Sequence, residues 1–275
     1  IYAYPNQVDN YTQSHYQLHA SHRVTDALTA NGALHYTRGF GFYEEYRYNN
    51  DFEDYGLPPA TVGQEVVIST DLVRRRWLDN HFYGFTYSLN YESERLNSVL
   101  GGGWNQYDGD HFGEITWAAV AGNVPKDYRY YFNNGLKNDF NIFWKNNYSL
   151  TNRLAAFVDL QYRTIDYRAG GRENRQFDFN INREFHFFNP KFGLTYAVNP
   201  HQQLYASYSV ANREPVRDDF VDARQGRVPK HETLRNLEAG WRWRKQQVAL
   251  TANYYLMDYV NQLVPTGAVN DVGAS

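Results

Sequence analysis

The sequence predicts an all-β, antiparallel up-and-down fold that crosses a membrane as a β-barrel. Three observations lead to this prediction: period-two alternation of apolar residues, connections that alternate between short and long, and aromatic residues that gather near strand ends. The 275 residues include 25 Tyr, 17 Phe and 6 Trp, far more aromatic residues than a disordered chain carries. We therefore expect a folded chain with a large apolar surface.

The alternation is clearest from Leu154 to Tyr162, where apolar residues at even positions enclose polar residues such as Asp159 and Gln161. Successive side chains of a strand point to opposite faces, so this pattern predicts a strand with one apolar face. The same pattern recurs, less cleanly in the first half, and gives ten predicted strands. They lie around residues 16–20, 28–36, 83–89, 96–104, 140–144, 154–162, 192–198, 204–210, 237–243 and 248–256.

The predicted connections alternate in length. Short clusters of turn-forming residues fall near residues 25–26, 93–95, 151–152, 199–201 and 245–246. Long connections fill roughly residues 47–71, 108–137, 170–190 and 213–235. Short turns at one end and long loops at the other are typical of outer-membrane barrels, whereas soluble sandwiches rarely sort their loops so regularly.

Hydropathy excludes membrane-spanning helices but not a membrane barrel. The mean hydropathy is −0.71, and no run approaches the ~18 apolar residues that a spanning helix needs. Strands of a membrane barrel alternate lipid-facing with lumen-facing residues and therefore average out as polar. Aromatic pairs such as Trp241 with Trp243 and Trp144 with Tyr148 favour an interfacial girdle; the alternative is aromatic pairing across a soluble sheet.

Composition also limits the function. A net charge of −3 gives no basic field for nucleic acid, and the absence of Cys excludes disulfides and thiolate metal sites. The sequence has no His-Glu-x-x-His, Gly-x-Ser-x-Gly or P-loop motif. We therefore expect no enzyme and name no catalytic residue. Gly101–Gly103 lack the Lys and Ser/Thr of a phosphate loop and indicate close strand packing or a kink.

One cluster has the residue types of a metal site. Asp108, Asp110, His111 and Glu114 fall together in a predicted loop, and carboxylates with imidazole are competent ligands for first-row ions. The alternative is a polar loop that closes on itself through hydrogen bonds. We therefore regard these four residues as weak metal candidates.

Several longer motifs resemble one known family. The clearest are YASYSVANREPVRDDF at residues 205–220, the His-Glu-Thr-Leu and Asn-Leu-Glu-Ala-Gly segments within residues 231–240, and NYYLMDYVNQLVPTG at residues 253–267. These segments resemble the late barrel of TonB-dependent outer-membrane receptors. Residues 6–19, 35–46, 74–85 and 110–118 resemble the middle barrel of the iron-complex receptor subgroup. The resemblance covers nearly the whole chain.

The resemblance implies a 22-stranded barrel in the bacterial outer membrane, occluded by an N-terminal plug. Because this sequence shows about ten strands and no plug-like start, we expect residues 1–275 to be part of the barrel domain, with the plug absent from the chain. The implied partners are outer-membrane lipid, a small-molecule metal chelate, and the TonB–ExbB–ExbD complex acting through the missing plug. No resident cofactor is expected. The implied cargo is an iron chelate, foremost a ferric siderophore, with haem and cobalamin as alternatives.

Aromatic and cationic side chains at the rims of the long loops are the candidate ligand contacts. Arg forks and aromatic faces suit the planar, anionic surfaces of ferric chelates. The alternative role is to stiffen the loops. Within Arg74–Arg76, alternation places Arg75 on the face opposite the other two. This run is either a basic lumen or rim patch that helps guide anions or a contact with anionic lipid headgroups. The candidates are Tyr107, Trp117, Tyr128, Arg129, Tyr130, Tyr131, Arg172 and Arg175.

Two other classes of protein remain open at this point. An outer-membrane barrel enzyme, such as a protease or lipase, needs a His with a carboxylate or Ser at one rim, and the sequence offers no compelling set. A soluble all-β adhesion or carbohydrate-binding module would use tyrosine-rich loops to stack on sugars, and it would fold without detergent.

Overall fold

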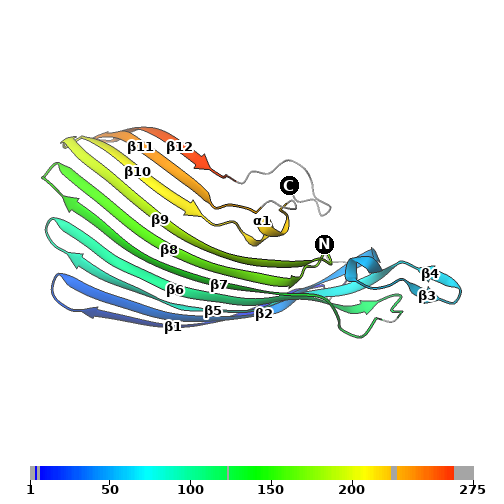
Figure 1. Cartoon of the computed structure of the whole chain (residues 1–275). Coiled ribbons are helices and arrows are strands. Elements are labelled where there is room, and N and C mark those ends of the chain that lie inside the picture. Colours follow the sequence, from blue (N-terminus) through cyan, green and yellow to red (C-terminus); the bar gives the residue numbers. More distant parts are fainter. Residues whose placement is uncertain (1–3, 5–6, 123, 224–227, 263–275) are drawn as a thin grey trace.

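The computed structural model describes residue 4 and residues 7–122, 124–223 and 228–262. Ten long strands form one sheet in which each strand pairs, antiparallel, with its neighbours in the chain (Figure 1). The predicted ten-stranded meander is therefore confirmed. Residues 263–267, which end the last of the family-like motifs, lie outside the described residues. The strands are β1 Asp9–Arg23, β2 Leu28–Asp51, β5 Ser69–Glu92, β6 Leu96–Ala118, β7 Tyr128–Ser149, β8 Leu154–Arg172, β9 Asp178–Asn199, β10 Gln202–Arg213, β11 Glu232–Lys245 and β12 Val248–Val260.

The connections sort by length as predicted. Tight turns close one end of the sheet, and at residues 25–28 the Thr25 hydroxyl accepts backbone N–H bonds from Ala27 and Leu28. The opposite end, here called the loop end, carries the 3-10 helix η1 (Phe52–Tyr55), the hairpin of β3 (Ala60–Val62) and β4 (Glu65–Val67), and the helix α1 (Arg217–Val221). Figure 1 shows the β3–β4 hairpin projecting beyond the long strands. No helix among the described residues is long and apolar enough to cross a membrane.

The predicted extents of two long loops are wrong, because the strands on either side are longer than expected. Most of residues 108–137 belongs to β6 and β7, and most of residues 170–190 belongs to β8 and β9. The apolar alternation stops before the strands end, because polar residues such as Asp108, Asp110 and Asn134 occupy part of the outer face, and this stretch looks like a loop in the sequence. Pairings such as Asp110 with Asn134 nevertheless continue the backbone ladder. Cross-strand side-chain bonds support it, since Asn134 Nδ2 donates to both Asp108 and Asp110 at 2.8 Å.

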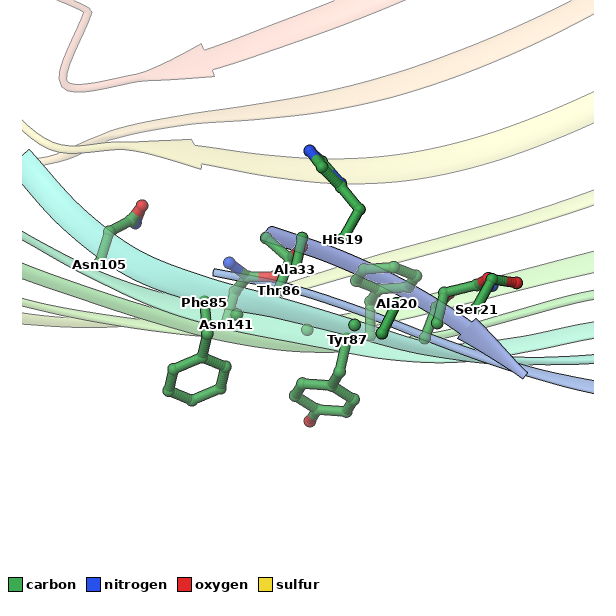
Figure 2. A pocket seen from close by; sticks show the side chains of 15 residues that line it. His19, Ala20, Ser21, Ala33, Phe85, Thr86, Tyr87, Asn105 and Asn141 are labelled. Atoms are coloured by element: carbon green, nitrogen blue, oxygen red, sulfur yellow. The ribbon is translucent and has the colours of Figure 1, made fainter. Parts of the chain in front are cut away.

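The sheet has two different faces. The inner face carries the β10–β11 connection, because the Lys137 ammonium on β7 binds Glu214 and the Tyr167 ring on β8 lies 6.5 Å from Phe220 of α1. Figure 2 shows the alternation that separates the faces: His19, Thr86 and Asn141 lie on one side of the sheet, and the rings of Phe85 and Tyr87 point to the other. The inner side there is a shallow hollow of about 630 Å³.

The outer face carries an apolar belt nearest the tight turns. On β5 this belt runs from Tyr91 to Tyr83, and on β7 it runs from Tyr148 to Phe140. That length matches the ~9–11 residues with which a strand crosses a bilayer. Rings stand at its loop-side edge, where Tyr83 lies 5.9 Å from Trp104. Its exposed members include Leu18, Leu34, Phe85, Leu100, Trp144, Leu194, Leu237 and Leu250.

The glycine run on β6 is confirmed as a place of close packing. Gly101 lies on the inner face opposite Phe143, and a Cβ there would come within 2.7 Å of the Phe143 ring and 2.9 Å of the Tyr87 carbonyl oxygen. Only a residue without a side chain allows this approach. The run therefore has a structural role in the barrel wall.

Candidate functional site

Five buried side chains form a cluster on the inner face at the loop end. Tyr55 of η1, Tyr130 and Tyr131 of β7, Leu72 of β5 and Ile115 of β6 are each at most 5% exposed. We call Tyr55, Tyr130 and Tyr131, with the two arginines that enter among them, Arg74 and Arg76, the inner tyrosine cluster. Tyr128 packs against its edge.

A bulge in the β6–β7 pairing explains why the adjacent residues Tyr130 and Tyr131 lie on the same face. The β6–β7 register shifts between Gly113 and Glu114, so both Tyr130 and Tyr131 face the single residue Gly113. A Cβ on Gly113 would lie 2.3 Å from the Tyr131 ring and 2.4 Å from the Tyr130 ring. The bulge supplies the second tyrosine, and the glycine leaves the space that both rings need.

Two arginines of β5 enter the cluster from one side. The Arg74 Nε donates to Glu45 at 2.7 Å, and its guanidinium also donates to the Tyr55 hydroxyl at 3.3 Å. The Arg76 Nε donates to the Tyr131 hydroxyl at 3.3 Å. Arg75 points to the outer face, where it pairs with Glu44 at 2.7 Å. The predicted alternation of these three arginines is confirmed.

The hydroxyl groups of the cluster are held protonated and one of them is unpaired. Burial raises the pKa of Tyr55 above its ordinary value, although the nearby Arg74 charge opposes that shift. The Tyr55 hydroxyl donates to Asn50 Oδ1 at 2.7 Å. The Tyr130 hydroxyl is buried and has no hydrogen-bond partner among the described residues. A buried hydroxyl without a partner is costly, so packing of the two neighbouring rings, rather than a hydrogen bond, holds Tyr130 in place.

A hollow of about 330 Å³ adjoins the cluster. Its inner-face lining includes Tyr11 and Tyr43, the guanidinium of Arg76 and the imidazole of His111. The Tyr11 hydroxyl donates to Asn80 Oδ1 at 2.7 Å, which fixes the ring, and the His111 Nε2 lies 3.5 Å from the Tyr107 hydroxyl. Aromatic faces, hydroxyl donors and a cation suit a planar anionic ligand.

The β10–β11 connection lies against the same inner face. Glu214 accepts from Lys137 at 2.6 Å and from Arg163 at 3.1 Å, and Arg163 also pairs with Asp139 at 2.5 Å. We call these four residues the Glu214 latch. Partial burial alone would raise the pKa of Glu214, but the bonds from Lys137 and the charge of Arg163 outweigh it and hold that pKa below its ordinary value.

The structure divides the predicted ligand contacts into two groups. Tyr128, Tyr130 and Tyr131 lie on the inner face of β7 near Arg74 and Arg76, although they were expected at the rim of a long loop. Tyr107 lies on the inner face of β6 farther from the loop end, where its hydroxyl is 3.5 Å from His111 Nε2. The remaining four lie apart from the cluster. Trp117 is 50% exposed, Arg129 lies on the outer face beside Glu114, Arg172 forms an exposed pair with Asp178, and Arg175 pairs with Asp222.

The metal candidates do not converge. Asp108, Asp110, His111 and Glu114 lie on β6 rather than in a loop. Asp108 and Asp110 bind Asn134 on the outer face, while His111 lies on the inner face. Glu114 pairs with Arg129 at 3.2 Å. The described part of the chain contains no group of three or more His, Cys, Asp or Glu that can hold a metal ion.

Sequence reasoning missed Tyr55, Tyr11 and Tyr43 as members of this region. Tyr55 lies in η1, within a connection where no alternation assigns a direction to its side chain. Tyr11 and Tyr43 lie on paired strands, and their closeness follows only from the β1–β2 register. For Tyr43, alternation along its strand was the one sequence signal that could have indicated the face on which its side chain lies.

A meander of long antiparallel strands, with tight turns at one end, an apolar belt outside and a polar inner face, defines the wall of an up-and-down β-barrel. The particular family follows from comparison with known proteins. The chain belongs to the TonB-dependent receptor-like β-barrel family, whose model matches residues 2–275. None of the curated proteins matches this sequence.

Solved structures share the fold at low sequence identity. The closed form of the ferric-catecholate import receptor Fiu from E. coli K12 has 13% identity and a TM-score of 0.61, covering 97% of this chain and 42% of Fiu. The siderophore receptor PiuA from Acinetobacter baumannii has 12% identity and a TM-score of 0.56, covering 90% of this chain and 40% of PiuA. The copper transporter OprC has 12% identity and a TM-score of 0.64, covering 90% and 38%. This chain therefore spans less than half the length of these proteins.

Proposed function

We propose that this chain is part of the barrel wall of an outer-membrane receptor that captures a scarce chelated nutrient and imports it. The hollow beside the inner tyrosine cluster carries the proposal, because it brings the Arg76 guanidinium together with the rings of Tyr11 and Tyr43. Family membership supports the receptor class. The relatives named above are import receptors or transporters, which supports binding and transport rather than an enzymatic reaction.

The outer membrane is the proposed location. A soluble protein rarely exposes a continuous apolar surface as large as the apolar belt, whereas lipid would cover it. The polar inner face then encloses the passage, as in other membrane barrels. Energy would come from the TonB–ExbB–ExbD complex acting through a plug domain supplied from outside residues 1–275. This assignment disfavours the soluble carbohydrate-binding alternative.

The proposed cargo is an iron chelate, most specifically a ferric siderophore. The Arg76 guanidinium would attract its negative charge and donate hydrogen bonds to it, and the rings of Tyr11 and Tyr43 would contact its planar groups. The ligand would bring its metal already chelated, so the protein would contribute no metal ligand and no covalent step. The likeness to Fiu and PiuA supports an iron complex as the cargo, and the likeness to OprC leaves a copper complex as the alternative.

Quenching of tryptophan fluorescence tests this proposal on the full-length, detergent-purified receptor. The panel contains ferric catecholate and hydroxamate siderophores, haem, cobalamin and a cupric chelate. We expect saturable quenching by a ferric siderophore, with a dissociation constant raised on the order of tenfold by Arg76→Gln, which removes a charge-assisted donor.

Arg172→Gln is the matched control for that variant. Arg172 is an exposed arginine of the same sheet whose ion pair with Asp178 lies in solvent, so its loss should leave the affinity unchanged. Equal effects of the two substitutions, or binding of no chelate in the panel, would overturn the assignment of the ligand to the inner tyrosine cluster.

A further inference from the structure

A histidine lines the hollow beside the inner tyrosine cluster, next to a cation. The His111 imidazole and the Arg76 guanidinium border the same space of about 330 Å³. His111 lies on β6 beyond Trp104, where the apolar belt ends on that strand, so it stands outside the lipid-covered part of the wall. Its side chain is half-buried, and its Nε2 lies 3.5 Å from the Tyr107 hydroxyl.

Two arginines from different elements place positive charge near this imidazole. Arg76 enters from β5, and Arg217 comes from α1, where its guanidinium binds Glu173 at 2.5 Å and lies 4.9 Å from the Phe179 ring centroid. Burial lowers the pKa of the His111 imidazole to about 4, and the charges of Arg217 and Arg76 add to this effect. The imidazole is therefore neutral near pH 7.

The carboxylates around His111 are engaged elsewhere or exposed. Glu173 is bound by Arg217, and Asp110 points to the outer face, where it accepts from Asn134. Asp9 is an exposed residue of the hollow's lining. The residues paired with His111 on β5 and β7 are the uncharged Leu78 and Asn133. Among the described residues, no carboxylate bonds to the imidazole.

A negative charge in the hollow reverses this electrostatic balance. An anion that reaches the Arg76 guanidinium enters the same space that His111 borders. An opposite charge within about 4–6 Å raises the pKa of an imidazole by roughly 1–3, so a chelate with several negative charges brings that of His111 to about 6–7. Because the pKa is higher in the complex than in the free receptor, the complex binds more protons between these values. Affinity for the anion therefore rises as pH falls through about 7.

We propose that this hollow captures an anionic chelate together with one proton from solvent, which the His111 imidazole holds while the chelate is bound. The protonated imidazole then becomes a second cationic donor beside Arg76. A neutral chelate gives the imidazole no reason to protonate, so the hollow selects for net negative charge and binds more tightly in acidic surroundings. This inference rests on the proposed function and adds a proton to its binding step.

Isothermal titration calorimetry of the full-length, detergent-purified receptor tests this inference. The probe is a trianionic ferric tris-catecholate complex, compared with a neutral ferric tris-hydroxamate complex. Titrations near pH 6 in two buffers of different ionisation enthalpy give the number of protons taken up per chelate. We expect about 0.5–1 proton with the anionic complex and close to none with the neutral one. The dissociation constant of the anionic complex should fall about four- to twentyfold from pH ~7.5 to pH ~5.5.

His111→Gln keeps a polar side chain but cannot titrate, so proton uptake should vanish and the affinity should lose its pH dependence. His35→Gln is the matched control. His35 is a half-buried histidine on the inner face of β2, its ring lies 4.9 Å from that of Phe82, and it does not line the hollow. This variant should take up protons as the unmodified receptor does.

Arg217→Gln provides a second test that does not alter the histidine. It removes a charge that opposes protonation of the free receptor, so His111 is already partly protonated before the chelate arrives. Near pH 5, uptake on binding should fall by about half. Unchanged uptake in this variant would contradict the role given to the arginines.

The outcomes separate this inference from the function itself. Binding of the anionic complex without proton uptake would overturn the inference and leave the chelate receptor intact. Uptake that persists in His111→Gln would also overturn it, by assigning the proton to a carboxylate such as Asp9 or to the chelate. Binding of the neutral complex alone would show that the hollow does not select negative charge. If no chelate of the fluorescence panel binds, the proposed function fails and this inference fails with it.

Discussion

At the scale of single residues, Gly113 decides whether the inner tyrosine cluster can form. Gly113→Ala would place a methyl group 2.3–2.4 Å from the rings of Tyr131 and Tyr130, which must then move. We expect a loss of about 1–3 kcal/mol of stability, as for other overpacked sites, together with weaker chelate binding. Thermal unfolding and the fluorescence titration measure the two effects.

Gly135→Ala provides the comparison for that substitution. Gly135 lies on β7 of the same sheet, and nothing lies within 4 Å of a Cβ built there. Alanine should be neutral or slightly stabilising at this position, because it restricts the unfolded chain without a clash. A Gly113→Ala receptor as stable and as tight-binding as Gly135→Ala would contradict the packing argument.

Single residues also show how much of the site could be predicted from the sequence. Tyr130 and Tyr131 are adjacent, so simple alternation sends them to opposite faces; the bulge beside Gly113 brings both inside. No local sequence pattern predicts that bulge. Arg129 was expected at the ligand as a cationic side chain at the rim of a long loop, but its strand position and its pairing with Glu114 place it on the outer face. Residue types singled out Tyr130 and Tyr131, and strand register decided which residues accompany them.

At the scale of elements, the Glu214 latch links the β10–β11 connection to β7 and β8. The pKa of the Glu214 carboxyl lies below its ordinary value. The latch therefore stabilises this connection fully at pH values above the ordinary pKa, and it loses the effect as pH falls through the lowered pKa. We expect segment 214–223 to be protected at pH 7 and to open below about pH 4.5, the region of the unperturbed Glu pKa. Hydrogen exchange resolved by segment measures this opening.

Glu214→Gln should open the same segment at pH 7, with faster exchange across the α1 region. Asp178→Asn serves as control, because it removes a carboxylate whose pair with Arg172 is exposed and contributes little. Unchanged protection in the Glu214 variant, or equal loss in both variants, would show that other contacts hold this connection.

Strand existence was predicted well because alternation in the apolar belt is a direct physical signal of one face in an apolar medium. Strand ends were not predicted, because beyond Tyr83 or Phe140 polar and apolar residues mix on both faces and the strict alternation stops, while backbone pairing continues. The ladder needs only hydrogen-bonded neighbours, which a single sequence does not specify. Residues such as Asp108 and Asn134 therefore looked like a loop and belong to paired strands.

At the scale of the whole molecule, the barrel wall should tolerate charge on one face only. Leu194 lies in the apolar belt and is 53% exposed, and Leu194→Lys would place an ammonium group in hydrocarbon at a cost of about 2–4 kcal/mol. We expect a reduced amount of folded receptor in the outer membrane, measured by the heat-dependent mobility shift of membrane barrels.

Thr195→Lys places the same charge on the adjacent residue of β9. Thr195 is paired with Ala155 and Tyr205 on the inner face, so a lysine there meets the polar interior and assembly should proceed normally. Equal assembly of both lysine variants would contradict the assignment of the two faces, and with it the membrane location.

The most direct measurement of the central claim is an anomalous-scattering map, recorded at the iron edge, of the full-length receptor crystallised with the ferric chelate that it binds most tightly. The account predicts an iron peak on the inner face, with the chelate in contact with Arg76 and with the rings of Tyr11 and Tyr43. A peak at the β3–β4 hairpin or on the outer face would contradict it.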